Sequence, residues 1–476
     1  MVMLETQKKL KVLVAIASYG TSNDQYLSQL LAEYRSMSFD VDVVVMSNLN
    51  KALGPGIEVA VGLPEENPWS LPFAHKQIFA DRLDQYDLFI YSEDDTLITE
   101  RNLCAFVRAS GVLADNELAG FLRFEVSREN TVSYPEIHGH FHWDVSSVRL
   151  RGGQAFAFLT NEHSACYVLT REQLRRAIAS GGFLVRPHQE KYDLLCSAAT
   201  DPYTQCGFRR LICISQIDDF VIHHLPNKYV GKLGVGDAEL RRQISRLMQV
   251  GGNGHRPTPL FKTDTKLRNG LYSKGYYEPA RPEILSLIPA NARRVLSVGC
   301  GWGATEVCLV ERGMAVTALP LDPVIPGGVE SRAMELVAGD FETAVRQLAG
   351  RQFDCILLLD LLHLVENPRS VLSSLKNLMT LDSVAVVSVP NLQRLPVIWQ
   401  RLQGDDQVAM MSDYERGGVH WTSRRALRRW VNDAGMRIES LSGTLAGRSR
   451  RASRATLGLM NSYLASEFIA AVRRAE

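Results

Sequence analysis

The chain has 476 residues and a formal net charge of +1, with 46% hydrophobic, 22% charged and 8% aromatic residues. This length exceeds one ordinary core and predicts two or three domains, and the composition is that of a globular enzyme, which excludes a disordered or fibrous chain. The near-zero charge gives no global attraction to nucleic acid, so an anionic ligand has to be bound by a local site.

The cysteines and the N-terminus indicate a cytoplasmic protein. The 8 cysteines form no CxxC pair and have no regular spacing, which argues against a zinc knuckle or a disulfide framework and favours a reducing compartment. The apolar run at residues 12–17 follows several lysines like a signal peptide, but it is shorter than an h-region of about 7 to 15 residues. We interpret it as a buried strand, and no apolar run is long enough to predict a transmembrane helix.

Strand-like and helix-like segments alternate through the first half. The predicted strands are residues 11–19, 40–47 and 86–91, and the predicted helices are residues 23–37 and 72–85. Strict alternation indicates an α/β domain with a parallel sheet and helices on both faces. Ligands bind at the carboxyl ends of the strands in such sheets.

Three consecutive acids, Glu93, Asp94 and Asp95, follow the strand at 86–91 and therefore lie at the expected mouth of a ligand crevice. Clustered carboxylates repel one another unless a divalent cation lies among them, and Mg²⁺ and Mn²⁺ prefer such oxygen ligands. The alternative is a solvated turn in which Asp95 or Thr96 caps the next helix.

The strand "VLVAIASYG", the triplet in "YSEDDTLIT" and the histidine pair in "VIHHLPNKY" together resemble a GT-A-type glycosyltransferase over residues 8–230. The resemblance implies Mn²⁺ or Mg²⁺, a nucleotide-sugar donor and a glycan acceptor. It also implies a set of site residues. Asp95 would be the main metal ligand, and Glu93 and Asp94 would contact the metal or the ribose. His223 or His224 would complete the metal site. Ser18 and Tyr19 would lie by the nucleotide. The first acid of this DxD-like motif is Glu, which is a departure from the family.

An inverting glycosyltransferase needs a carboxylate base near the acceptor. The candidates are Glu190, Asp193 and Asp201, and the sequence does not choose among them. His138, His140 and His142 alternate in "YPEIHGHFHWD", which is consistent with a metal site, an acceptor-lining loop or a solvated strand.

A domain boundary is expected near residue 250. The segment 237–249 is predicted to be helical, and the Gly- and Pro-rich stretch that follows has little periodicity. We expect a first domain at residues 1–250, a linker at 251–270 and a second domain at 271–476.

The second half begins with a helix that contains Ile284, Leu285 and Leu287, followed by a strand at 293–299 and a glycine-rich turn. Gly299, Gly301 and Gly303 form GxGxG, where missing side chains let the main chain approach a ligand. A nicotinamide-binding fold or a purely structural turn would explain this motif equally well.

Five segments in order, "VLSVGCGWG", "VAGDFETA", "FDCILLLDLLHLVENP", "VAVVSVPN" and "HWTSRRALRRWVNDAGM", resemble class I S-adenosylmethionine-dependent methyltransferases, particularly those often encoded beside sugar transferases. The resemblance implies a Rossmann-like fold and S-adenosylmethionine as cofactor, with the cofactor passing close to the main chain at Gly301. The cofactor-binding residues carried over from the motifs are Gly299, Cys300, Gly301, Gly303, Leu321, Asp322, Asp340, Phe341 and Asp360.

Two positions depart from that family. Ser297 stands where many relatives have an acid, and Pro320 stands where an acid usually binds the ribose. Asp322 has the same strand parity as Pro320 and is expected to substitute for that acid. If it does not reach the ribose, cofactor affinity is expected to be lower, and a non-catalytic methyltransferase domain is the alternative. His363 and His420 are the candidate bases for methyl transfer, with packing inside a helix as the alternative role of His363.

The C-terminal segment carries Arg448, Arg450, Arg451 and Arg454 before an expected amphipathic helix that contains Leu459, Tyr463, Phe468 and Ile469. Such a helix fits peripheral contact with an anionic inner membrane or a lipid-linked acceptor, or packing within or between subunits.

The sequence therefore predicts a bifunctional glycosyltransferase and methyltransferase that acts on a glycan or glycoconjugate in bacterial surface polysaccharide biosynthesis. The alternatives are a glycosyltransferase with a non-catalytic methyltransferase-like domain, and a nucleotide-dependent carbohydrate-binding scaffold.

Overall fold

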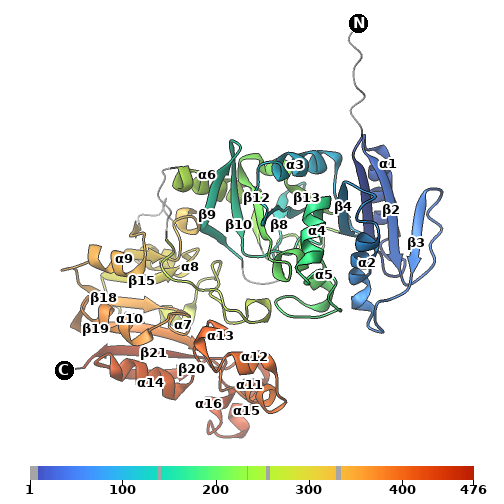
Figure 1. The fold of residues 1–476 in the computed structure, drawn as a ribbon. Coiled ribbons are helices and arrows are strands. Elements are labelled where there is room, and N and C mark those ends of the chain that lie inside the picture. Colours follow the sequence, from blue (N-terminus) through green and yellow to red (C-terminus); the bar gives the residue numbers. More distant parts are fainter. Residues whose placement is uncertain (1–8, 138–140, 233, 253–257, 329–333, 476) are drawn as a thin grey trace. The chain divides into compact units, whose positions relative to one another are not determined.

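The computed structural model describes residues 9–137, 141–232, 234–252, 258–328 and 334–475, and the chain divides into two units at Gly251 (Figure 1). His138 and His140 lie outside the described residues. No helix in these ranges is long and apolar enough to cross a membrane.

The first unit, residues 1–251, contains a five-stranded sheet of order β3-β2-β1-β4-β11. Its strands are β3 (Ile57–Val61), β2 (Asp40–Ser47), β1 (Lys11–Ala17), β4 (Leu88–Glu93) and β11 (Cys166–Thr170). The pairs β1–β2, β1–β4 and β2–β3 are parallel, while β11 is antiparallel to β4. The three predicted strands of this half are thereby confirmed.

The apolar pattern accounts for these elements. The whole run from Val12 to Ala17 is buried, as expected for a parallel strand with both faces covered. Helix α1 (Asp24–Ser36) buries Leu27, Leu30, Leu31 and Tyr34, which recur on one face at helical spacing. The predicted second helix is shorter than expected, because the 3₁₀ segment η1 (Pro68–Phe73) precedes α2 (Ala74–Asp81).

Two further sheets complete the first unit, with orders β6-β12-β10-β9 and β14-β8-β7-β13-β5. Their strands are β5 (Thr96–Leu97), β6 (Glu117–Ala119), β7 (Leu122–Val126), β8 (Val132–Tyr134), β9 (Trp143–Arg151), β10 (Gln154–Leu159), β12 (Arg209–Cys213), β13 (Val221–His224) and β14 (Val235–Gly236). The remaining helices are α3 (Glu100–Ser110), α4 (Arg171–Ala179), α5 (Leu194–Thr204), η2 (Ile214–Asp219) and α6 (Asp237–Gly252), the last of which contains the predicted helix 237–249.

The second unit, residues 252–476, contains a seven-stranded sheet of order β17-β16-β15-β18-β19-β21-β20. Its strands are β15 (Arg294–Cys300), β16 (Ala315–Pro320), β17 (Glu335–Leu336), β18 (Phe353–Leu358), β19 (Met379–Pro390), β20 (Met436–Gly443) and β21 (Glu467–Arg474). All strands from β17 to β19 in this order are parallel, and β21 is antiparallel to both β19 and β20.

Helices surround this sheet, and both of its faces are covered by apolar cores. Alternate residues of β15 point to opposite faces, so Leu296 and Val298 enter one core and Val295 enters the other. The helices are α7 (Pro282–Leu285), α8 (Ala304–Glu311), α9 (Phe341–Gln347), α10 (Pro368–Lys376), α11 (Leu395–Leu402), α12 (Asp406–Met410), α13 (Tyr414–Gly417), α14 (Arg424–Asp433), α15 (Gly447–Ala455) and α16 (Asn461–Leu464), with the 3₁₀ segments η3 (Arg268–Gly270) and η4 (Ile325–Gly328).

One expectation is corrected here. The expected C-terminal amphipathic helix does not include Phe468 and Ile469, because these residues belong to strand β21 and are buried in the sheet. In the expected linker, Leu260 and Leu267 are buried, and Leu260 N–H donates to the Leu321 carbonyl at 2.9 Å.

Candidate active sites

Each unit has one point at which its strand order reverses, and ligands bind outside the carboxyl ends of the strands at such a point. In the first unit it lies between β1 and β4, where Ser18 and the acid triplet follow their strands. In the second it lies between β15 and β18, where the glycine-rich turn and Asp360 follow.

Asp94 is held by two side chains from the end of β1. Ser18 Oγ donates to Asp94 Oδ2 at 2.6 Å, and Asn23 Nδ2 donates to Asp94 Oδ1 at 2.7 Å and to Asp95 Oδ2 at 3.3 Å. The prediction placed Ser18 at this crevice, and the structure brings it into contact with the triplet. Tyr19, by contrast, has a half-exposed side chain.

Strand register brings His224 to the triplet and keeps His223 away from it. Strand β13 runs antiparallel to β5 with His224 opposite Thr96, and parallel to β7, which carries Glu125. His224 Nε2 lies 3.5 Å from Asp95 Oδ2, and its Nδ1 lies 2.5 Å from Glu125 Oε1. The side chain of the neighbouring His223 points away from the triplet. Its ring contacts Asn227 and stacks on Phe124.

The pKa values of the three acids of the triplet shift in different directions. Burial, together with the charge of Asp95, raises the pKa of Glu93 to about 8. Burial also raises the pKa of Asp94 to about 6, against its hydrogen bonds from Ser18 and Asn23. For Asp95 the effect of burial is outweighed by the contact with His224, so its pKa lies below the usual value.

The triplet has unsatisfied oxygens that suit a cation. Glu93 Oε1 and Asp95 Oδ1 are buried without a hydrogen-bond partner, and a buried polar atom in this state costs free energy. The described residues contain no preformed cage of three or more metal-ligating side chains. Such a cage is not required, because Mg²⁺ keeps several waters and takes one or two carboxylates plus substrate phosphates. Glu93 and Asp95 are thus the residues of the triplet that carry an oxygen without a hydrogen-bond partner.

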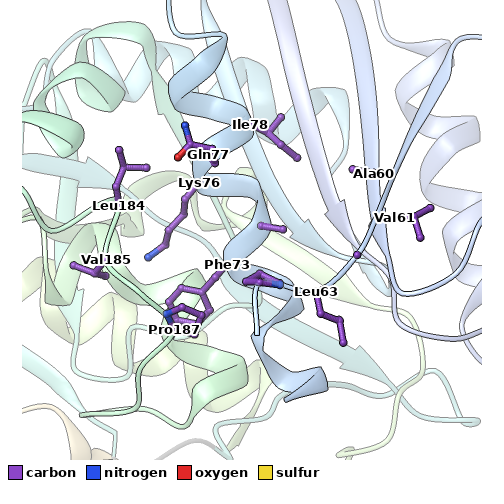
Figure 2. Close-up of a pocket in the computed structure, with 13 residues that line it drawn as sticks. Ala60, Val61, Leu63, Phe73, Lys76, Gln77, Ile78, Leu184, Val185 and Pro187 are labelled. Carbon is purple, nitrogen blue, oxygen red and sulfur yellow. The ribbon is translucent and has the colours of Figure 1, made fainter. Parts of the chain in front are cut away.

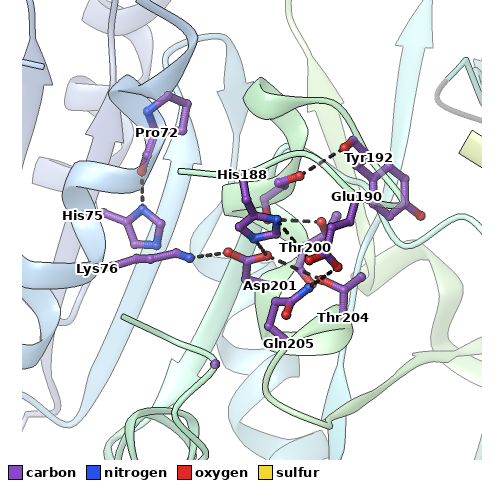
Figure 3. Close-up of polar contacts among 12 residues, drawn as sticks. Pro72, His75, Lys76, His188, Glu190, Tyr192, Thr200, Asp201, Thr204 and Gln205 are labelled. Atoms are coloured by element: carbon purple, nitrogen blue, oxygen red, sulfur yellow. Dashed lines mark hydrogen bonds and ion pairs between the residues drawn. The ribbon is translucent and has the colours of Figure 1, made fainter. Parts of the chain in front are cut away.

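The three candidate bases of the first unit have different surroundings, and Figure 3 shows those of Glu190 and Asp201. Asp201 is fully buried, forms an ion pair with Lys76 and lies 3.1 Å from His188 Nε2. Glu190 is exposed and accepts a hydrogen bond from Gln205 at 2.9 Å. Asp193 caps α5 by accepting from Cys196 N–H at 2.9 Å, and its charge acts on Glu93. Of the three candidates, Asp193 is the one whose charge contributes to the raised pKa of Glu93.

A cavity of about 430 Å³ lies beside β3, α2 and residues 184–187 (Figure 2). Its lining is mainly apolar and includes Leu63, Phe73 and Val185, with Lys76 and Gln77 as polar members. The Lys76 ammonium is already paired with Asp201, and burial lowers its pKa. A lining with so few available polar groups does not match a hydroxyl-rich sugar.

In the second unit, residues 274–278 cover the glycine-rich turn. Trp302 N–H donates to the Tyr276 carbonyl at 2.7 Å, and a Cβ on Gly301 would lie 2.4 Å from the same oxygen. The cavity beside the turn measures about 30 Å³, which is space for one water molecule. In this structure the missing side chain of Gly301 accommodates the main chain at Tyr276.

A second acid compensates for Ser297. Ser297 Oγ donates to Glu306 Oε1 at 2.5 Å, and both residues are buried. Glu306 belongs to the first turn of α8, the helix that follows the turn at Gly303. The resemblance implied an acid at the strand position of Ser297, and in this structure the carboxylate beside Ser297 belongs to helix α8.

The other predicted cofactor residues have main-chain roles or pack in the core. Asp322 Oδ1 accepts the Val324 and Ile325 N–H groups at 2.7 and 2.9 Å, and Asp340 caps α9 by accepting from Thr343 N–H at 2.9 Å. Leu321 and Phe341 are buried. Cys300 is buried beside Glu306, and burial raises its pKa well above the usual value.

Asp360 lies just beyond the carboxyl end of β18 and has a φ of +47°. It pairs with Arg281 at 2.6 Å, and Ser388 Oγ donates to it at 2.9 Å. Arg281 also pairs with Glu467 at 2.8 Å, so one guanidinium links the ends of two strands.

The two candidate bases of the second unit hold loops together. His363 Nε2 lies 2.9 Å from the Tyr272 carbonyl, and His420 Nε2 lies 2.9 Å from the Val365 carbonyl. His420 N–H also donates to the His363 carbonyl at 2.8 Å. Burial lowers the pKa of His363 to about 4, and burial also lowers the pKa of His420. Both rings are therefore weak bases at neutral pH.

Residues 272–441, which lie wholly within the second unit, match the family model of a methyltransferase domain. Residues 272–441 form a class I S-adenosylmethionine-dependent methyltransferase domain. A similar curated relative is the ubiquinone biosynthesis O-methyltransferase of Xanthomonas axonopodis pv. citri, 28% identical over 198 residues that cover 39% of this chain and 81% of the relative. The enzyme of the same name from Xylella fastidiosa (strain 9a5c) is 24% identical over 194 residues that cover 36% of this chain and 77% of the relative.

Solved structures similar to this chain include methyltransferases from Archaeoglobus fulgidus and Mesorhizobium loti, both described as S-adenosylmethionine-dependent. The first is 14% identical and covers 40% of this chain and 90% of its own, with a TM-score of 0.31. The second is 16% identical and covers 40% and 96%, also with a TM-score of 0.31.

Several residues at these sites escaped sequence reasoning. Asn23, Glu125 and His163 reach the triplet or its histidine from distant parts of the chain, which no local motif indicates. Asn23 precedes α1, Glu125 lies on β7, and His163 lies in the loop before β11, with its Nε2 3.8 Å from Glu93 Oε1. For the methyltransferase domain, the acid in "GATEV" directly after the glycine-rich turn was a usable signal for Glu306.

Proposed function

We propose that this chain combines two activities, with the methyltransferase domain acting on a hydroxyl group and residues 1–251 transferring a sugar from a nucleotide donor to a glycan or glycoconjugate. The observation that carries the second activity is the buried triplet at the reversal point of the first sheet, with unsatisfied oxygens on Glu93 and Asp95. The hydroxyl acceptor is supported by the names of the two O-methyltransferase relatives.

In the first unit Glu93, Asp95 and His224 would hold a divalent cation. Such a cation supplies positive charge to the diphosphate of a sugar nucleotide. The chain's own contribution is to fix the ligands: Ser18 and Asn23 orient Asp94, and Glu125 orients the His224 ring. Asp193 is the proposed base, because its charge acts on the triplet whereas Asp201 is already paired with Lys76.

Release of nucleoside diphosphate tests the sugar-transfer activity. The full chain is incubated with UDP-, GDP- and dTDP-sugars and Mn²⁺, with and without a chelator. We expect Mn²⁺-dependent release that Asp95→Asn abolishes and that Asp115→Asn, at an exposed acid of the same unit, leaves intact. Equal release by Asp95→Asn in chelator contradicts the assignment.

In the methyltransferase domain S-adenosylmethionine supplies a methyl group on a sulfonium. Glu306 and Glu278 line the cavity beside the glycine-rich turn and fit a positively charged group. The cavity is much smaller than the roughly 300 Å³ or more typical of ligand sites. We therefore propose that residues 274–278 move away from the turn when the cofactor binds.

Calorimetry and hydrogen exchange test this step on the full chain. S-adenosylmethionine should bind equally to the parent and to Asp95→Asn, and it should change the exchange of peptides that span residues 274–278 more than that of peptides from β17. Binding without any change in residues 274–278 would show that the cofactor lies elsewhere, and absence of binding favours a scaffold role for the domain.

A further inference from the structure

Helix α11 exposes an apolar stripe. Leu395, Trp399 and Leu402 recur at helical spacing, and the relative exposures of Trp399 and Leu402 are 62% and 75%. The only buried member of this helix is Val397. Scattered exposed apolar residues are ordinary, but a contiguous stripe marks an interaction surface.

The segment α15–α16 is a second unpartnered element in the same unit. Neither helix has a buried residue, and Leu457 and Leu459 between them are 90% and 85% exposed. Arg448, Arg450, Arg451 and Arg454 of α15 line a hollow of about 480 Å³. Within the part of the chain that the structure describes, none of these four arginines has a carboxylate within 4.0 Å.

These two elements are neighbours. The Asn391 side chain, four residues before α11, donates to the Ser462 carbonyl of α16 and to the Ala465 carbonyl, both at 2.9 Å. Figure 1 shows α11, α15 and α16 grouped together. We call Leu395, Trp399, Leu402, Leu457, Leu459 and the four arginines the α11–α16 surface.

The α11–α16 surface lies at a defined edge of the sheet. Helix α11 follows the carboxyl end of β19, and β21 begins opposite Pro390 directly after α16. Strand β19 is parallel to β18 and β18 is parallel to β15, so this is the edge that carries the glycine-rich turn.

We propose that the α11–α16 surface binds the face of an anionic lipid bilayer. Exposed Leu and Trp side chains enter the boundary between headgroups and acyl chains, while nearby arginines bind lipid phosphates. The charge is complementary because the arginines have no acidic partner within the described residues. A nucleic acid would use the arginines but would leave Leu457 and Leu459 in water, and a purely apolar partner would leave four charges unmatched.

Vesicle sedimentation tests the proposal with the full chain. Vesicles of phosphatidylcholine with phosphatidylglycerol should bind the parent, whereas vesicles of phosphatidylcholine alone should bind it at least tenfold more weakly. Arg448→Gln/Arg451→Gln/Arg454→Gln should lose about a hundredfold in affinity for the anionic vesicles. Trp399→Ser/Leu402→Ser should lose at least tenfold.

Matched controls distinguish the contribution of this surface to vesicle binding from that of overall positive charge and surface hydrophobicity. Arg424→Gln/Arg425→Gln/Arg428→Gln removes the same charge from exposed positions of α14, and Leu381→Ser removes an exposed leucine from β19. Both should bind like the parent. All substituted side chains are exposed, so circular dichroism should show an unchanged fold for every variant.

Tryptophan emission supplies a direct readout. Anionic vesicles should shift the emission of the parent to shorter wavelength, and this shift should be absent in Trp399→Phe and absent with inorganic phosphate. The proposal is overturned if the α14 variant loses as much affinity as the α15 variant, or if neither surface variant loses affinity. It is also overturned if the surface variants change only the oligomeric state in solution, which would assign the surface to a second copy of the chain.

Discussion

Gly301 lies directly against the main-chain carbonyl of Tyr276, at a distance that leaves no room for a Cβ atom. The glycine is required by the fold of the methyltransferase domain itself, before any cofactor is considered. A side chain here pushes residues 274–278 off the turn, because the neighbouring atoms are main-chain atoms that cannot rotate away.

Gly301→Ala should therefore destabilise the second unit without cofactor, by about 1 to 3 kcal/mol as is typical of overpacking. Hydrogen exchange of β15 and β18 peptides measures the effect. Gly313→Ala is the matched control, since its Cβ would meet nothing within 4 Å and only its φ of +81° opposes the change. Because Gly301 itself has no positive φ, a loss in Gly301→Ala no larger than that in Gly313→Ala would contradict the role of the Tyr276 contact.

Substitutions that change the charges of Ser297 and Glu306 should have non-additive effects on the free energy of unfolding. Ser297→Asp places two carboxylates at the position where Oγ and Oε1 are now 2.5 Å apart, and it should destabilise the second unit. Adding Glu306→Gln supplies an amide donor to the introduced carboxylate and should recover most of the loss, with a coupling free energy of about 0.5 to 3 kcal/mol. A double-mutant cycle followed by hydrogen exchange measures it. Strict additivity would mean that the two side chains do not interact in solution.

The buried His363 should make the second unit sensitive to acid. Burial lowers its pKa to about 4 from the usual 6.5, so the folded protein binds fewer protons than the unfolded chain between these values. The stability is complete above about pH 6.5 and is lost as the pH falls through 4, to a total on the order of 3 kcal/mol.

Hydrogen exchange of the β18 peptide between pH 4 and 7, corrected for intrinsic exchange, measures this loss. His363→Gln retains a donor for the Tyr272 carbonyl and cannot gain a proton, so its stability should fall less steeply with pH. A parent and a variant with the same slope would show that His363 is not responsible.

Glu125 should control Mn²⁺ binding through His224. A carboxylate only accepts hydrogen bonds, so the contact with Glu125 fixes the proton on Nδ1 and leaves Nε2 to face Asp95. Glu125→Gln removes this preference and should weaken Mn²⁺ binding by about 10- to 100-fold, as for other partners of metal-ligating histidines. Electron paramagnetic resonance of free Mn²⁺ measures it. His223→Gln, at the ring that faces Asn227, should bind Mn²⁺ like the parent, and a loss there equal to that of His224→Gln would contradict the assignment.

The sequence predicted the strands that lead into both sites because β1, β4 and β15 are short apolar runs followed by polar or glycine residues. It did not decide between His223 and His224, because that choice depends on the pairing of β13 with β5, a long-range contact with no local signal. Strand β21 was taken for a helix, since "FIAAVRR" contains good helix formers and its conformation is set by pairing with β19 and β20.

The position of β21 also has a consequence for biosynthesis. Strand β21 lies between β19 and β20. Neither of these two strands can form its hydrogen bonds to β21 until residues 467–474 have been synthesised. Until then β19 and β20 each present an unpaired strand edge, a known template for aggregation. Expression should therefore be more sensitive to substitutions in β21, which follows the other strands of this sheet in the sequence, than to equally buried ones in the earlier strand β16.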